Sequence, residues 1–312
     1  MTLSFKGTKP KLIVITGPTA SGKSALAVSL AKHIGAEIIS ADSRQVYKDI
    51  PIVTAIPSIE ERQGITHHLL EILPLNSYYS AAKFKEDSEN ILKDLFDKNE
   101  YAIVCGGSML YIDALVNGID ELPTVPVNIR ETLTKEWKDN GDTWLLERLR
   151  EIDPVYFERV DLKNLKRVFH AIEVSITAGK PYSSLLTKKD NLLQPENREY
   201  DILKICLNGD RDKLFEKINT RVLHMVEAGL EEEARKVYPL RELNSLNTVG
   251  LKEMFSMFDG KFTRDEAISR IQKNTRVYAK KQLTWHKRDS DMIYLNFQDS
   301  NESNIERILG LL

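Results

Sequence analysis

The apolar residues of the chain gather in short runs, and amphipathic stretches with helical spacing lie between them. Four runs have the length and composition of buried strands; they are residues 12–16, 37–40, 102–105 and 201–207. Helical patterns follow the strands, for example at residues 25–31 and 80–97. Strands that alternate with helices predict an α/β fold, in which a parallel sheet is flanked by helices.

The pattern changes between residues 118 and 197. A stretch with two prolines at residues 122–126 breaks regular structure, and helical patterns without a strand follow,. These patterns cover residues 127–138, 143–151 and 164–177. A helical block between strands of one sheet predicts an inserted subdomain. We therefore expect a core of residues 1–120 and 198–312, and a helical insertion of residues 121–197.

Residues 51–74 show no regular pattern and contain His67 and His68. Adjacent histidines point in different directions, and no third ligand stands at a spacing typical of zinc sites. We therefore interpret this pair as taking part in local packing and hydrogen bonding.

The composition narrows the class of protein. The 312 residues carry a formal net charge of −2, which excludes a uniformly basic surface but allows a local basic stripe. No apolar run approaches the roughly 20 residues that span a bilayer, and the first strand begins too early to leave room for a signal peptide. Cys105 and Cys206 end apolar runs, which indicates buried, reduced thiols. We expect a cytoplasmic protein without a membrane segment.

One loop carries the clearest chemical signal. The sequence Gly-Pro-Thr-Ala-Ser-Gly-Lys-Ser stands between the strand predicted at 12–16 and the helix predicted at 25–31, which is the context of a phosphate-binding loop (P-loop),. Glycines let backbone N–H groups surround an anion, and a lysine adds a point charge. We expect a P-loop kinase-like fold, with Ser24 as the Mg²⁺ ligand. The predicted diphosphate- or nucleotide-binding residues are Gly17, Pro18, Thr19, Ala20, Ser21, Gly22, Lys23, Ser24, Arg211 and Arg221.

Asp42 directly follows the second predicted strand. In open α/β sheets ligands bind at the carboxyl ends of the strands, so we expect Asp42 beside the P-loop. There it would organise Mg²⁺ or accept a proton; the alternative is that it caps a short helix that follows it. Gly106, Gly107 and Ser108 follow the third strand, where the glycine pair favours either close approach to a ligand or a plain turn.

Two stretches are locally basic. Residues 270–288 contain seven Lys or Arg residues and no acidic residue, and Tyr278, Trp285 and His286 lie among them. Long cationic side chains beside aromatic rings suit a phosphate backbone and unstacked bases, so this stretch favours nucleic acid over a merely solvated face. The second basic face, for which solvated surface is the default interpretation, comprises Lys163, Lys166, Arg167 and His170.

Taken in order, these segments resemble the tRNA dimethylallyltransferases, also called tRNA isopentenyltransferases. The P-loop has the family's narrower Gly-Pro-Thr-Ala-Ser-Gly-Lys form, and the resemblance extends over nearly the whole chain. The further matching segments are residues 40–47, 54–55, 68–70, 79–82, 106–111, 166–167, 171–174, 179–180, 249–253 and 279–285.

The resemblance implies transfer of the dimethylallyl group from dimethylallyl diphosphate to N6 of adenosine 37, beside the anticodon of tRNA. Mg²⁺ and the P-loop would stabilise the departing diphosphate, and Asp42 would accept the N6 proton as general base. Thr19 and Ser108 would lie at the reaction channel, and Arg130 would help to position the substrates. The expected partners are dimethylallyl diphosphate and the anticodon stem-loop of tRNA, and we expect a monomer.

The resemblance also assigns tRNA contacts, and it implies that the helical insertion grips the anticodon arm. The implied tRNA-binding residues are Asp42, Ser43, Arg44, Gln45, Lys166, Arg167, Val168, Phe169, His170, Asn247, Thr248, Val249, Gly250, Leu251, Lys252, Lys280, Lys281, Gln282, Leu283, Thr284, Trp285, His286 and Lys287. The sequence lacks the Cys/His zinc finger of eukaryotic relatives, so we expect a bacterial-type enzyme.

Some positions depart from the family pattern, and they bear on RNA specificity more than on the reaction. In this chain Ile56 replaces a lysine that is common in the family, and Lys83 replaces an acidic residue. His170 and Lys281 each replace an arginine, and Leu251 replaces a tyrosine. Three alternatives stay open. A P-loop kinase that uses ATP on a small metabolite leaves the basic stretch unexplained, and a prenyltransferase of free adenine nucleotides does not need it. An RNA-binding module without enzyme activity gives Asp42 no role.

Overall fold

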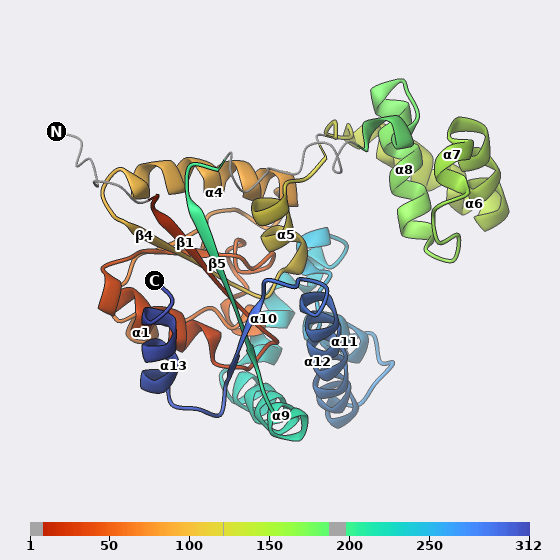
Figure 1. Cartoon of the computed structure of the whole chain (residues 1–312). Helices are drawn as coiled ribbons and strands as arrows, with labels where there is room; N and C mark the ends of the chain where they lie inside the picture. Colours follow the sequence, from red (N-terminus) through yellow and green to blue (C-terminus); the bar gives the residue numbers. More distant parts are fainter. Residues whose placement is uncertain (1–8, 121, 187–197) are drawn as a thin grey trace. The chain divides into compact units, whose positions relative to one another are not determined.

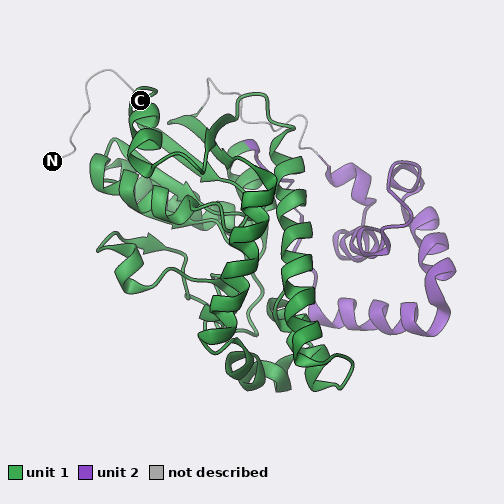
Figure 2. Ribbon diagram, turned by 90° about the horizontal axis from the view of Figure 1, so that it is seen from below, with its two compact units in different colours: residues 1–116, 195–312 green, residues 117–194 purple. Residues whose placement is uncertain are grey.

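The computed structural model describes residues 9–120, 122–186 and 198–312. The chain forms two compact units, residues 1–116 with 195–312 and residues 117–194, which Figure 2 shows in different colours. The P-loop, Asp42 and the basic stretch at 270–288 fall in the first unit, whereas Arg130 and the basic residues at 163–170 fall in the second.

The first unit is built on a parallel sheet whose described strands run in the order β3-β2-β4-β1-β5-β6. The strand β1 (Lys11–Thr16) pairs with β4 (Tyr101–Cys105) and β5 (Asp201–Asn208), so that Ile13 lies between Ile103 and Leu203. The other strands are β2 (Ile38–Ser40), β3 (His67–His68) and β6 (Ile293–Asn296). Parallel strands are buried on both faces, which explains their continuous apolar runs. The predicted parallel α/β fold is confirmed.

Helices cover both faces of this sheet (Figure 1). On one side α1 (Lys23–Ile34) packs with α13 (Asn301–Leu309), and on the other lie α4 (Ala81–Phe96) and α5 (Met109–Asn117). The core on the α1 side includes Ile13, Leu26 and Leu30, which have no exposed surface. The further helices are α9 (Arg211–Glu227), α10 (Leu230–Val237), α11 (Leu251–Phe258) and α12 (Arg264–His286), with the short η3 (Tyr238–Leu240) and η4 (Asn244–Leu246).

The stretch 51–74 is more regular than the sequence predicts. It contains the one-turn helices α2 (Pro51–Thr54) and α3 (Ile59–Arg62) and the edge strand β3. Elements of two to four residues are too short to leave a periodic pattern in the sequence. His67 bonds to the carbonyl of Ile65 and His68 bonds to Glu37, so the histidine pair packs and forms hydrogen bonds as expected.

The second unit is helical in its described part. Its elements are α6 (Val127–Ile152), α7 (Pro154–Phe157), α8 (Leu165–Ala178) and the short η1 (Tyr182–Leu185). Gly141, with φ of 80°, interrupts α6, so the two helices that the sequence predicts are its two arms. Leu145, Leu149, Val168 and Ile172 have no exposed surface and form the core of this unit.

Two predictions concern a membrane segment and the state of the two cysteines. Among the described residues, no helix is long and apolar enough to cross a membrane. Cys105 and Cys206 are free and buried, and burial raises the pKa of their thiols to about 11 and about 12. Both thiols are therefore protonated and unreactive near neutral pH.

Candidate active site

The P-loop joins β1 to α1 in a conformation that its glycines require. Gly17 has a φ of 147°, and a Cβ there would lie 2.7 Å from the carbonyl oxygen of Leu207. Gly22 has a φ of 86° and stands at the N-terminus of α1, where no side chain of the described residues caps the first turn. The first N–H groups of α1 are therefore free to face a ligand, and the helix dipole favours an anion there. The buried hydroxyl of Ser21 has no hydrogen-bond partner among the described residues.

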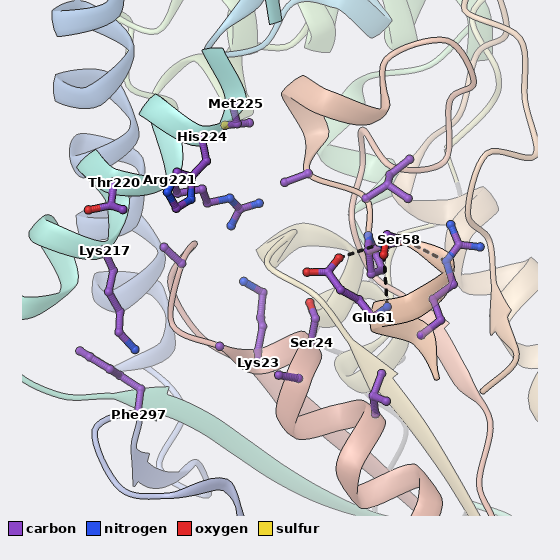
Figure 3. A pocket seen from close by; sticks show the side chains of 18 of the residues that line it. Lys23, Ser24, Ser58, Glu61, Lys217, Thr220, Arg221, His224, Met225 and Phe297 are labelled. Atoms are coloured by element: carbon purple, nitrogen blue, oxygen red, sulfur yellow. Dashed lines mark hydrogen bonds between the residues drawn. The ribbon is translucent and has the colours of Figure 1, made fainter. Parts of the chain in front are cut away.

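A cleft of about 1360 Å³ opens at this loop. Its walls are the P-loop with the start of α1, the segment 51–63 that contains α2 and α3, and one face of α9. Figure 3 shows Lys23 and Arg221 directing their charged ends into the cleft, with Ser24 beside Lys23 and Glu61 facing them from α3. The cleft thus joins a phosphate-binding loop to a second cation from a distant part of the sequence.

Both cations are held in surroundings that disfavour their charge. Desolvation lowers the pKa of Lys23, and the neighbouring Arg221 lowers it further, while Asp42 acts in the opposite direction. Desolvation also lowers the pKa of Arg221, against the influence of Asp42 and Glu61. Neither cation forms an ion pair within 4.0 Å among the described residues. Two desolvated cations without a close counter-ion make a site that an anion such as diphosphate would stabilise.

Asp42 lies at the end of β2 and acts electrostatically on both Lys23 and Arg221. Its Oδ1 accepts hydrogen bonds from the backbone N–H groups of Arg44, at 2.9 Å, and Gln45, at 3.4 Å. It therefore has a capping role, as the alternative to a chemical role held, but the element that it caps is a turn and not the predicted short helix. In the described part of the chain no hydrogen bond reaches its Oδ2, so one oxygen stays available to a substrate. The two roles are compatible.

Thr19 and Ser108 both have structural partners at this centre. The backbone N–H of Thr19 donates to Gln282 Oε1 at 3.0 Å, and its Oγ1 accepts from Arg221 at 3.2 Å. Ser108 Oγ accepts from the backbone N–H of Ser43 at 2.7 Å. The two residues thereby fix the P-loop to α9 and α12, and the end of β4 to the loop that carries Asp42.

The glycine pair before Ser108 serves close packing within the protein. A Cβ on Gly106 would overlap the backbone of Ala41, and a Cβ on Gly107 would overlap the side-chain amide of Gln282. The pair lies in the turn between β4 and α5, and the groups that approach it closely are protein groups. They bring the ends of β2, β4 and α12 together.

Arg44 and Gln45, which the resemblance assigns to tRNA, form internal hydrogen bonds. The Arg44 guanidinium donates to the carbonyls of Asn244, Ser245 and Asn247. The Gln45 amide donates to the carbonyls of Thr54 and Ala55. Arg44 therefore anchors the segment that leads to residues 247–252, and Gln45 anchors α2, which is part of the cleft wall.

Glu233 of α10 holds the other end of α2. Its two carboxylate oxygens accept hydrogen bonds from the backbone N–H groups of Ile52, at 2.7 Å, and Val53, at 2.8 Å. Burial raises the pKa of Glu233, while these two backbone donors act against the rise. A carboxylate from a separate helix therefore caps α2, which forms part of the cleft wall. The sequence does not reveal this contact.

Several assigned tRNA contacts need correction because their side chains are buried. Gln282 is 1% exposed and His286 3%, and Val168 and Leu251 have no exposed surface. Gly250 is buried as well. Close packing therefore keeps these side chains from an RNA surface. The exposed members of the assigned set are Lys166, Arg167, Asn247, Lys252, Lys280, Lys281, Thr284 and Lys287, and the partly exposed ones are Asp42, Ser43, Arg44, Gln45, Phe169, His170, Thr248, Val249, Leu283 and Trp285.

The basic stretch is also less free than its sequence indicates. α12 ends at His286, so Lys287 and Arg288 follow the helix instead of lying on it. Arg276 and Lys280 lie over the ring of Phe215, and Arg270 lies over Phe262. Such cation–π contacts hold the stems of the cations against the protein.

Of the two arginines expected to contact the substrates, Arg130 has an ion-pair partner within its own unit, and Arg211 does not line the cleft. Arg130 lies in the second unit, where its guanidinium donates to Glu173 at 2.8 and 2.9 Å, and His170 donates to the same carboxylate at 2.9 Å. Burial would raise the pKa of Glu173, but the hydrogen bonds from His170 and Arg130 lower it. Arg211 lies over the ring of Phe215 and is not among the residues that line the cleft.

The cleft also contains residues that sequence reasoning missed. Glu61 was missed although its spacing from Ser58 is that of a capping box, which was a usable signal,. Phe297 was missed because it follows a short strand. Lys213, Lys217 and Arg221 line the cleft at four-residue spacing along α9, so the spacing on this predicted helix was a usable signal. Tyr278 lies beside Asp42, and desolvation followed by the charge of Asp42 raises its pKa to about 12.

The fold and this site define a class of protein. A parallel α/β sheet, a P-loop at the end of β1, two desolvated cations and a neighbouring carboxylate are the features of a P-loop protein that binds a phosphorylated substrate.

Comparison with known proteins identifies the family within that class. Residues 45–289 match the family model for IPP transferase. The chain is 46% identical over 295 residues to tRNA dimethylallyltransferase 2 of Azobacteroides pseudotrichonymphae, covering 94% of each chain. It is 46% identical over 287 residues to tRNA dimethylallyltransferase 2 of Parabacteroides distasonis, covering 91% of this chain and 94% of the relative. The chain belongs to the tRNA dimethylallyltransferase family of enzymes.

Solved structures agree with this assignment. The tRNA delta(2)-isopentenylpyrophosphate transferase of Staphylococcus epidermidis is 32% identical with a TM-score of 0.70, and the match covers 97% of this chain and 98% of that one. A eukaryotic dimethylallyltransferase acting on tRNA is 26% identical with a TM-score of 0.78, and the match covers 92% and 74% of the two chains.

Proposed function

We propose that this protein transfers the dimethylallyl group of dimethylallyl diphosphate to N6 of adenosine 37 in tRNA and releases diphosphate. The observation that carries the proposal is the meeting of three features in one unit of a chain of this family. They are a P-loop whose following helix has no side-chain cap among the described residues, the desolvated cations Lys23 and Arg221, and the carboxylate of Asp42 beside them.

The reaction breaks one bond and forms another. The bond between the allylic carbon and the diphosphate oxygen breaks, and the nitrogen lone pair of adenine N6 bonds to that carbon. Asp42 Oδ2 takes the proton that N6 loses. Lys23, Arg221 and the first N–H groups of α1 stabilise the charge that develops on the departing diphosphate. An adenine amino group is a weak nucleophile, so this stabilisation of the leaving group supplies much of the rate enhancement.

The residues present also fit a Mg²⁺ ion. Ser24 offers an exposed hydroxyl in the first turn of α1, beside Lys23 and within the cleft. Mg²⁺ keeps several waters and commonly binds through one or two protein oxygens together with substrate phosphates. No group of three His, Cys, Asp or Glu residues suited to a metal exists among the described residues, which agrees with a site completed by diphosphate. When bound, Mg²⁺ would add positive charge at the departing diphosphate.

The tRNA is bound in this proposal by exposed cations. In the first unit these are Lys280 and Lys281 on α12 with Lys287 after it, and in the second unit Lys166 and Arg167 on α8. Phosphate contacts of this kind supply salt-dependent affinity. Adenosine 37 must leave its stack to reach Asp42, which costs a few kcal/mol. We further propose that the protein acts as a monomer in the cytoplasm, where Cys105 and Cys206 stay reduced.

Mass spectrometry of the tRNA tests the proposal directly. The protein is incubated with tRNA, Mg²⁺ and dimethylallyl diphosphate labelled in its allyl group. We expect the label on the adenosine beside the anticodon, with one diphosphate released for each group transferred. Label in free adenosine monophosphate but not in tRNA would contradict the tRNA substrate. Transfer of the γ-phosphate of ATP to a small metabolite, without allyl transfer, would favour the kinase alternative.

A further inference from the structure

The helix α12 contacts the P-loop through the buried amide of Gln282. Gln282 Oε1 accepts a hydrogen bond from the backbone N–H of Thr19 at 3.0 Å, and Gln282 Nε2 donates to the carbonyl of Gly107 at 2.8 Å. The side chain is 1% exposed. Gln282 therefore bridges the loop that follows β1 and the loop that follows β4.

The chemistry of this bridge suits a carboxamide. Thr19 presents a donor and Gly107 an acceptor, so the side chain between them needs one acceptor and one donor at its tip. The two main-chain partners also fix which end of the amide is oxygen and which is nitrogen. A glutamate would direct an oxygen at the carbonyl of Gly107, and a methionine would leave both backbone groups unpaired in a buried place.

Neighbouring residues on the same face of α12 extend the contact. One turn further, His286 Nε2 lies 3.1 Å from Thr16 Oγ1, which donates to the carbonyl of Gly106. Because the threonine proton is used in that bond, His286 must donate. One turn before Gln282, the hydroxyl of Tyr278 lies 3.4 Å from the carbonyl of Gly107. Three residues at four-residue spacing thus fasten α12 to the ends of β1 and β4.

We infer that Gln282 is a positioning residue of the transfer reaction and not a tRNA contact; this inference rests on the proposed function. By holding the Thr19 backbone at a fixed distance from Gly107, it sets the first half of the P-loop relative to Ser108 and the loop of Asp42. Thr19 also receives the hydrogen bond from Arg221. A shift of Thr19 therefore moves the diphosphate site away from the carboxylate, and misplacements of about 1 Å can cost about 100-fold in rate.

The bridge has a further consequence for the diphosphate site. Since the N–H of Thr19 is already bonded to Gln282, it does not belong to the donors that surround the diphosphate. Those donors lie later in the loop and in the first turn of α1. Gly107 is fixed by the same contact because a Cβ there would overlap Gln282 Nε2.

The test compares Gln282→Glu and Gln282→Met with Gln272→Glu and Gln272→Met. Gln272 is a matched control on the same helix, because its Nε2 also donates to a backbone carbonyl, that of Asn219 at 3.3 Å, remote in sequence from the P-loop. The measurements are single-turnover prenyl transfer, tRNA affinity with its salt dependence, the affinity for inorganic pyrophosphate with Mg²⁺, and the melting temperature.

We expect both Gln282 variants to lower the single-turnover rate by about 10- to 100-fold, to weaken pyrophosphate binding, and to leave tRNA affinity and its salt slope unchanged. Gly107→Ala, which displaces the same amide, should reproduce this pattern. The Gln272 variants should keep wild-type rates.

Three results would overturn the inference. Weakened tRNA binding with an unchanged rate would make Gln282 an RNA contact. A lower melting temperature with an unchanged rate for the folded fraction would leave it a purely structural role. An equal loss of rate in the Gln272 variants would remove the specific link to Thr19. If the wild-type protein transfers no prenyl group at all, the proposed function fails, and unchanged pyrophosphate affinity in both Gln282 variants then decides separately against this inference.

Discussion

The helices α12 and α8 look alike in sequence, since each carries cations assigned to tRNA, yet they bury different faces. Both helices bury apolar residues, such as Val168 and Ile172 on α8 and Ile271 and Ala279 on α12,. Their buried polar residues differ in partner: Glu173 and Ser175 of α8 bond within the second unit. Gln282 and His286 of α12 each bond to a defined group of the P-loop region. The two helices therefore carry similar exposed cations, but their buried polar side chains bond to different parts of the protein.

This difference has a physical meaning. An apolar face is held by packing, which stabilises its unit but specifies no particular partner atom. A buried polar side chain must find its donor or acceptor, so it fixes geometry to within a few tenths of an ångström. We conclude that the buried polar groups of α12 fix that helix to the P-loop region, whereas those of α8 fix it within the second unit.

The largest effect that we expect lies at the centre to which α12 is fastened. Asp42→Ala should lower the rate of prenyl transfer at least about 100-fold, because the N6 proton loses its acceptor. Binding of tRNA should stay close to that of the wild type. Single-turnover kinetics and a filter-binding assay measure the two quantities. Asp94→Ala, an exposed aspartate on α4 of the same unit, is the control, and near-normal turnover of Asp42→Ala would remove Asp42 from the mechanism.

The second largest effect that we expect is a difference between the two helices in how acid changes stability. Desolvation, with help from the charge of Lys23 and against that of Asp289, lowers the pKa of His286 to about 4. An unfolded histidine binds its proton near pH 6.5, so the unfolded state takes up the proton first and the stability from this residue falls as the pH drops from 6.5 through 4. Between pH 7.5 and pH 5 the loss should be about 2 kcal/mol.

For α8 the window lies lower. The pKa of Glu173 is lowered in the folded protein, so its contribution is present above the unfolded pKa of about 4.3 and is lost as the pH falls below it. Urea unfolding at pH 7.5 and pH 5 measures the contrast, followed by Trp285 for the first unit and by Trp137 and Trp144 for the second. His286→Gln should reduce the change in the first unit, and part of the change should remain because burial also lowers the pKa of His67. An equal change in both units would break the comparison.

Val168→Ala should act on stability alone. Val168 has no exposed surface, so its truncation leaves a cavity and should destabilise the second unit by about 1–2 kcal/mol. The folded variant should bind tRNA like the wild type, with the same salt slope. Arg167→Ala, at the exposed neighbouring position, is the control: it should weaken tRNA binding and leave stability unchanged. Weaker tRNA binding by a fully stable Val168→Ala protein would restore this residue to the RNA surface.

The smallest effect concerns a single exposed cation on each helix. Lys281→Ala on α12 and Lys166→Ala on α8 should each weaken tRNA binding a few-fold and reduce the slope of log affinity against log salt by roughly 1. Lys281 is the cleaner choice because Lys280 also lies over Phe215. The rate at saturating tRNA should be unchanged for both. An unchanged slope for one variant would show that its helix faces away from the RNA.

The P-loop was predictable because all its determinants lie in eight consecutive residues between a strand and a helix. Asp42 was predictable because the ends of parallel strands meet at one edge of a sheet. By contrast, α2 depends on contacts with residues outside it, whereas α3 begins with a local capping box of Ser58 and Glu61. Gln45 and Glu233 hold α2, and no local pattern encodes such a pair.

The error at Gln282 and His286 has a different source. A basic stretch shows that a helix carries cations, but composition does not say which face is buried. The spacing of Ala267, Ile271 and Ala279 indicates the buried stripe, and continuing it at intervals of three and four residues leads to Gln282 and His286,. The polarity of these two side chains concealed their position, because polar residues are ordinarily assigned to the surface.

The carboxylate of Glu233 couples the local unfolding of α2 to that of α10, although the two helices are far apart in sequence. A helix of four residues is too short to hold itself together, and the first backbone N–H groups of α2 bond to Glu233 on α10. The amide protons of Ile52 and Val53 should therefore exchange with solvent only when α10 detaches. Hydrogen exchange would then record α2 and α10 as one cooperative unit, so that one wall of the cleft opens and closes together with a helix about 180 residues further along the chain,.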